Sequence, residues 1–241
     1  MTEEELLAAA MLDADAQEQA RVDAEERGSR LLLLLLLLLG YTMLQLEDGT
    51  RIFQNARTGR TVNDASIRRE IDRYLDTQAT AAGALADKLR AGGISPLAFE
   101  RAMRDIIRAS HLNTTAIARG GYANLTRLDL AQTEGVIARE FKFLQKFVEE
   151  LRTGGQKLDG TLARRAKLYA RAARNTFYQA RQDNLAGTMT HVRSILNPAD
   201  HCDECIMLAG HWFRIGDPAY KLPGNRQCGP NCKCHEEYAA L

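Results

Sequence analysis

The residues of this chain best suited to chemistry are its five cysteines, which all lie between positions 202 and 234. Cys202 and Cys205 have the spacing C-x2-C, and a second group, Cys228, Cys232 and Cys234, begins after 22 further residues. Two turns that each offer two thiolates supply the four soft ligands that zinc binds in a tetrahedron. The pattern therefore predicts a structural zinc site with these five cysteines as candidate ligands.

Five cysteines for four positions leave the ligand set open. We favour Cys202 and Cys205 with two of the three later cysteines, and three histidines are alternative ligands: His201, His211 and His235. On a strand, Cys232 and Cys234 would point to the same face because they are two residues apart. Residues 208 to 218 favour a short strand and a turn around Trp212 and Phe213, and this aromatic pair is a candidate for partner binding. Such a module has little apolar mass, and metal binding would contribute roughly 10 kcal/mol or more to its folding.

A disulfide framework is the main alternative to a metal site, and unligated or partly paired thiols are another. The sequence begins Met-Thr-Glu-Glu-Glu and shows no basic-then-apolar signal peptide. An odd number of cysteines also suits disulfides poorly. A zinc deaminase is disfavoured, since no His-x-Glu lies upstream of Cys202-x2-Cys205.

The composition indicates a mainly helical globular chain of one large or two small domains. Of its 241 residues, 45% are hydrophobic and 26% are charged, and the net charge is +1, which gives no global basic signal for nucleic acid. The chain has no Gly-x4-Gly-Lys phosphate loop and no Gly-x-Ser-x-Gly elbow. We therefore expect no enzymatic activity.

Several short segments around the cysteines carry a family resemblance. They are Cys202-x2-Cys205, Leu208-Ala-Gly210, Pro223-Gly224 and Pro230-Asn-Cys232-Lys-Cys234. With these residues the C-terminal region resembles that of minor head proteins of tailed bacteriophages, the Mu-type head morphogenesis family. The match extends upstream to the stretch from Leu162 to Phe177. Two departures are visible: Gly229 stands where the family often carries His, and Lys233 replaces the usual Arg.

The resemblance implies a role in the virion or in head assembly. A protein of this family would be assembled in the host cytoplasm and would contact the phage portal, the major capsid protein or both. It would be present in multiple copies or as a homo-oligomer, and it would have no enzymatic activity.

The run of nine leucines from Leu31 to Leu39 is too short to span a membrane. As a helix it covers about 13 Å, whereas a bilayer core needs about 30 Å. A helix that is apolar on all sides is normally buried on all sides. We therefore expect Leu31, Leu35 and Leu39 to line an oligomer interface or a partner contact, with a central core helix of the monomer as the alternative.

Residues 41 to 62 change to the period of strands. The Asp48-Gly49 pair between two strand-like segments predicts a β-hairpin. Three long helices follow, each ending at a double glycine, over about 63–92, 95–120 and 124–152, and a fourth spans about 161–185. In the third helix the spacing 4-3-4-3 predicts a bundle seam, formed by Ile137, Phe141, Leu144, Val148 and Leu151.

The fourth helix is strongly basic and supports a second functional hypothesis. Its cations that could contact phosphates are Arg164, Arg165, Lys167, Arg171 and Arg174. The alternative to a phage head protein is therefore a zinc-containing protein that binds nucleic acid through this face. A solvated face of an ordinary helix explains the same residues without any ligand.

The fold class that we predict is mainly α, with a multi-helix body, a small β-hairpin and a C-terminal zinc-ribbon-like α+β module rich in cysteine. The expected parts are N-terminal helices over 1–40, the hairpin over 41–63, the helical body over 64–188 and the cysteine module over 189–241.

Overall fold

A computed structural model describes residues 41–45, 51–55, 61–62 and 64–241 of the chain. The expected N-terminal helices, including Leu31, Leu35 and Leu39, lie outside the described residues, as does the Asp48-Gly49 turn. Within the described part, the mainly helical class with two small sheets is confirmed.

The first sheet is the predicted hairpin with one further short strand. Strand β1 (Tyr41–Gln45) pairs antiparallel with β2 (Arg51–Asn55), and β2 pairs with β3 (Thr61–Val62). Met43 lies opposite Phe53 in this register.

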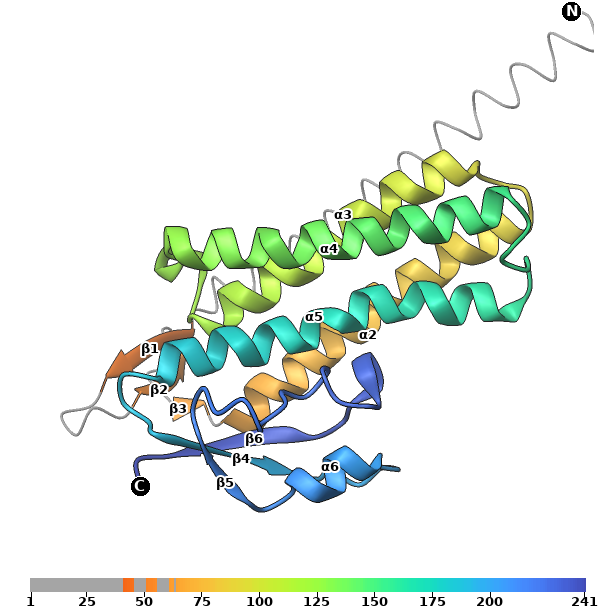
Figure 1. The fold of residues 1–241 in the computed structure, drawn as a ribbon. Coiled ribbons are helices and arrows are strands. Elements are labelled where there is room, and N and C mark those ends of the chain that lie inside the picture. Colours follow the sequence, from red (N-terminus) through yellow and green to blue (C-terminus); the bar gives the residue numbers. More distant parts are fainter. Residues whose placement is uncertain (1–40, 46–50, 56–60, 63) are drawn as a thin grey trace, which may run out of the picture.

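Four long helices form the body of the molecule and lie alongside one another in Figure 1. They are α2 (Asp64–Arg90), α3 (Pro96–Ala118), α4 (Arg127–Arg152) and α5 (Gly160–Leu185). A short 3-10 turn, Tyr122–Asn124, precedes α4. Among the described residues, no helix is long and apolar enough to cross a bilayer.

The helix boundaries follow local chemistry. The Ser95 side chain accepts a hydrogen bond from the backbone N–H of Ala98, and Pro96 occupies the first helical position. Helix α4 begins later than predicted because Thr126 and Asp129 form a capping box in which each side chain satisfies a backbone N–H of the other.

The apolar core has two parts, one toward each end of the bundle. The part farther from the C-terminal module contains Leu89, Phe99, Met103, Leu144, Phe147 and Leu162. The part beside the module contains Ile67, Ile71, Tyr74, Phe177 and Leu222. The predicted seam of α4 contributes to the core, with Ile137, Leu144 and Val148 buried and with Phe141 and Leu151 packed against the first part.

Between these two parts, the buried face of α3 is polar. Its residues there include Ser110, His111, Asn113, Thr114 and Thr115. Nδ1 of His111 lies 2.7 Å from the Thr176 hydroxyl of α5, while its Nε2 has no hydrogen-bond partner. Burial lowers the pKa of His111 to about 4. The middle of the bundle therefore contains buried polar side chains and hydrogen bonds beside its apolar contacts.

The C-terminal module is a three-stranded antiparallel sheet with strand order β5-β4-β6 and a short helix. Its strands are β4 (His191–Ile195), β5 (Trp212–Arg214) and β6 (His235–Ala239), and its helix is α6 (Asp203–Leu208). In Figure 1 the module lies against α5 and the beginning of α2. The strand at Trp212 was predicted, whereas α6 was not.

Candidate metal centre

The five cysteines converge on one point of the C-terminal module, and none forms a disulfide. The Cys205 sulfur lies 3.5 Å from that of Cys202, 3.5 Å from that of Cys228 and 3.7 Å from that of Cys232. Cys205, Cys232 and Cys234 are buried, and the other two pack against them. The sequence prediction that the two cysteine groups come together is therefore confirmed.

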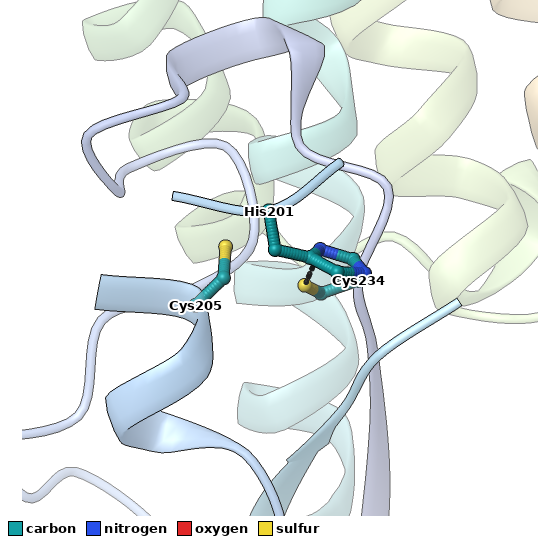
Figure 2. A group of neighbouring side chains, drawn as sticks. All are labelled: His201, Cys205 and Cys234. Atoms are coloured by element: carbon teal, nitrogen blue, oxygen red, sulfur yellow. Dashed lines mark hydrogen bonds between the residues drawn. The ribbon is translucent and has the colours of Figure 1, made fainter. Parts of the chain in front are cut away.

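His201, which is only an alternative ligand in the prediction from sequence, joins the cluster. Its Nδ1 lies 3.6 Å from the Cys234 sulfur, a contact that Figure 2 marks with a dashed line. Its Nε2 lies 2.7 Å from the backbone oxygen of Asn197. An N–H at Nε2 that donates to this carbonyl leaves the lone pair on Nδ1, which is the arrangement that a metal-binding imidazole needs. The other two histidines differ, since His211 is exposed and His235 lies on β6.

Cys202 and Cys205 are positioned by the start of helix α6. Cys202 is its N-cap residue and Cys205 lies one turn further on, so that both sulfurs reach the same side. The segment Leu208-Ala-Gly210 ends this helix. Leu208 is buried, and the backbone N–H of Gly210 donates to the Ser194 carbonyl of β4 at 2.8 Å. Gly210 has a φ of 76°, which glycine adopts without strain.

The second cysteine group is held by a 3-10 turn, Gly229–Asn231, whose N-cap residue is Cys228 and whose C-cap residue is Cys232. Upstream of it, Gly224 has a φ of 97°, and a Cβ built there would lie 3.0 Å from the Cβ of Asn175 on α5. The loop can therefore approach the bundle only because residue 224 lacks a side chain.

The expectation that Cys232 and Cys234 share one face of a strand needs a correction. Strand β6 begins at His235, so both cysteines precede it. Their sulfurs are buried because the loop packs onto α5, where Nη1 of Arg174 donates to the Cys232 carbonyl at 2.9 Å and the Tyr178 hydroxyl donates to the Cys234 carbonyl at 3.3 Å.

Two buried arginines fix the cluster to its surroundings. Arg226 is 3% exposed, and its Nη1 donates to Ser194 at 2.7 Å and lies 3.9 Å from the Cys205 sulfur. Arg174 also pairs with Asp72 of α2 at 2.7 Å, so that this one side chain links α2, α5 and the cysteine loop. The Arg226 guanidinium places positive charge beside a thiol that becomes anionic when it binds a metal.

The thiols differ in acidity because they are close together. Hydrogen bonding from Cys234 lowers the pKa of Cys232 to about 4, and the same interaction raises the pKa of Cys234. Burial raises the pKa of Cys205. A thiol must lose its proton to bind a metal, and metal uptake by this cluster should therefore release protons.

Two groups of side chains in this module have the composition and spacing to hold a metal ion. In each group all ligand atoms lie within 4.8 Å of one another: His201 with Cys205 and Cys234, and Cys202 with Cys205 and Cys228. Every donor is a sulfur or an imidazole nitrogen, and such soft ligands suit zinc better than magnesium or calcium.

The aromatic pair proposed for partner binding has two different environments. Trp212 is 37% exposed and lies under the Arg193 guanidinium, 4.6 Å from the ring centre. Phe213 is half-buried, and its ring centre lies 5.3 Å from that of Tyr220. On α6, Ile206 and Met207 are 57% and 67% exposed, and sequence reasoning did not single them out.

Four of the five basic residues proposed for nucleic acid make contacts within the protein. Arg165 pairs with Glu150 and lies over the Phe147 ring, and Arg171 pairs with Asp76.

Arg174 pairs with Asp72, and the Lys167 side chain passes close to Gly83 of α2. Arg164 is exposed. Three of the six cations of α5 therefore pair with carboxylates of α2 and α4.

A buried carboxyl group lies beside the cluster. Glu236 on β6 accepts hydrogen bonds from Gln182 at 3.1 Å and from the Tyr238 hydroxyl. Burial raises the pKa of Glu236 to about 7. The sequence offered no signal for it, because a charged residue on a short C-terminal strand normally faces water.

Comparison with known proteins gives no relative for this chain. No family model, no curated protein and no solved structure matches it.

Proposed function

We propose that this chain is a non-catalytic phage structural protein, a minor head protein that contacts the portal or the capsid protein during head assembly. We propose further that zinc holds its C-terminal module in shape. One observation carries the proposal: the segments that resemble the phage family are the ones that build the metal centre.

Each of those segments has a distinct part in the module. Leu208-Ala-Gly210 ends α6 and returns the chain to β4, and Pro223-Gly224 lets the loop approach Asn175. Pro230 lies in the turn between Cys228 and Cys232. A resemblance restricted to scattered surface positions would carry less weight than one that follows a single structural unit.

Zinc supports this role by stabilising a small sheet that buries little apolar surface of its own. A thiolate-rich closed site has no open coordination position, and such sites stabilise structure without catalysing a reaction. Bound metal would hold α6 in a fixed position, with its Ile206 and Met207 side chains exposed on the surface. Exposed apolar side chains on a rigid element are suited to protein–protein contact.

The first test is quantitative peptide mass spectrometry on particles purified from the source of this chain. A head protein would be present at a fixed ratio to the portal subunit. Absence from both mature and immature particles would refute the proposal.

A second test asks whether α6 makes the contact. We expect the double variant Ile206→Asp, Met207→Asp to fold and bind metal but to be excluded from particles. The matched control is Leu158→Asp, since Leu158 is 53% exposed and lies in the loop before α5, away from the module. Normal incorporation of the double variant would rule out docking through α6.

Zinc is tested separately by elemental analysis of the purified full-length chain. We expect zinc to copurify and to be released by a thiol-modifying reagent. Failure of the chain to retain zinc under reducing conditions would contradict a structural zinc site.

A further inference from the structure

The cluster contains six donor atoms, two more than one tetrahedral ion needs. They are the sulfurs of the five cysteines and Nδ1 of His201. An ion bound by Cys202, Cys205, Cys228 and Cys232 would leave the buried Cys234 thiol facing His201 without a metal. An ion bound on the other side would leave Cys202 and Cys228 unused.

The donors fall on two sides of a central pair. Cys202 and Cys228 form one group with Cys205, while His201 and Cys234 form another group with the same Cys205. The Cys232 sulfur lies 3.7 Å from that of Cys205 and interacts with the thiols of both Cys228 and Cys234. Cys205 and Cys232 therefore stand between the two sides.

We propose that the module binds two metal ions that share Cys205 and Cys232 as bridging thiolates. Cys202 and Cys228 complete the coordination of one ion, and His201 and Cys234 complete that of the other. Each ion then has four ligands, and all six donors are used. This inference rests on the metal-binding role proposed above and deepens it.

The distances agree with such an arrangement. Zinc–sulfur bonds of about 2.3 Å in a tetrahedron place ligand atoms about 3.8 Å apart. The separations from Cys205 to Cys202, Cys228 and Cys232 are 3.5, 3.5 and 3.7 Å, and Nδ1 of His201 lies 3.6 Å from Cys234. Both sides of the cluster thus already have spacings close to those of bound ligands.

Charge favours two ions over one. Four thiolates with one divalent ion would leave about two negative charges in a largely buried site and an unligated thiol, whereas five thiolates with two ions would leave about one negative charge. Arg226 lies close to Cys205, and its guanidinium offsets a single residual charge. The His201 tautomer fixed by Asn197 supplies a neutral ligand on the second side, which further limits the negative charge.

The test counts metal ions per chain in the full-length protein by native mass spectrometry together with elemental analysis, after reconstitution with excess zinc and removal of loosely bound metal. We expect two ions in the wild-type chain. Cys202→Ser and Cys234→Ser should each retain one, because each removes a terminal ligand from a different ion. His211→Gln, which changes an exposed histidine outside the cluster, should retain two.

Each result leads to a definite conclusion. One ion per wild-type chain overturns the two-ion inference but leaves the zinc proposal standing, and no retained ion overturns both. If a serine variant fails to fold, the wild-type count still decides. Reconstitution with cadmium-113 provides an independent spectroscopic check: two NMR signals with mutual coupling are expected from thiolate bridges, and a single signal would contradict them.

Discussion

Replacing His111 with leucine should reduce the acid sensitivity of the bundle. The pKa of this histidine is about 4 in the folded chain because burial disfavours its charged form, whereas an exposed histidine titrates near 6.5. The unfolded chain therefore takes up a proton at a pH at which the folded chain does not. Stability from this group is complete above pH 6.5 and is lost as the pH falls from 6.5 toward 4.

The magnitude follows from the two pKa values. A difference of 2.5 units corresponds to about 3 kcal/mol when the pH reaches 4, and about 2 kcal/mol of it is already lost at pH 5. The side chain is only 1% exposed and its Nε2 has no partner, so that solvent screening is small and no anion compensates the added charge. Nδ1 contacts a neutral hydroxyl, that of Thr176.

The assay is urea denaturation of the wild-type chain and of His111→Leu at pH 7, 6 and 5. At each pH the unfolding free energy of the variant is subtracted from that of the wild-type chain, and the change of this difference with pH is the result. The titration of all other groups cancels in the difference. We expect the wild-type chain to lose about 2 kcal/mol more than the variant between pH 7 and pH 5. His211→Gln serves as the control and should follow the wild type. Equal losses in wild type and His111→Leu would refute a buried neutral histidine.

Three further predictions concern the module and its attachment. Chelation of the metal should change the fluorescence of Trp212, the only tryptophan of the chain, while far-UV circular dichroism retains most of its helical signal. A parallel loss of both signals would contradict a helical bundle that stays folded without metal. Arg174→Ala should lower the unfolding free energy by about 2–3 kcal/mol in urea denaturation, because it removes the contacts to Asp72 and Cys232. Arg164→Ala, at an exposed position, should have little effect, and equal effects of the two variants would disprove that Arg174 links α2 to the cysteine loop. Gly224→Ala should lower the unfolding free energy by about 1–3 kcal/mol in the same assay, because of the positive φ at this position and the nearby Asn175. It should lower it more than Gly187→Ala, where nothing lies within 4 Å, and an unchanged stability of Gly224→Ala would contradict the close approach of the loop to Asn175.

The helices could be predicted from the sequence because their signals are local. Ser95-Pro96 begins α3, and the double glycines lie just beyond α2, α3 and α4. The start of α4 was placed too early because the pattern of apolar residues did not distinguish the 3-10 turn from the helix. The capping box at Thr126 was the signal that could have placed it correctly.

The metal site could be predicted only in part. Cysteine spacing identified the sulfur donors, since two turns of thiolates are a local pattern. The importance of His201 depends on its contact with Asn197 and its position relative to Cys234, which is 33 positions away in the chain. Such pairings are set by tertiary structure, and a single sequence carries no signal for them.

The role of the basic face of α5 also could not be predicted from the sequence alone. A run of cations without intervening acids suggested a solvated or ligand-binding surface, yet the partners of Arg165, Arg171 and Arg174 come from other helices. Charge on one helix can be interpreted only together with the surface that faces it.

The contact of Arg174 with both Asp72 and the Cys232 carbonyl has a mechanical consequence. It joins the cysteine module to α2 as well as to α5, the helix that carries Arg174. Ile71 of α2, Phe177 of α5 and Leu222 of the module also lie in one buried cluster. A pull on α6 is therefore borne by two helices of the bundle together.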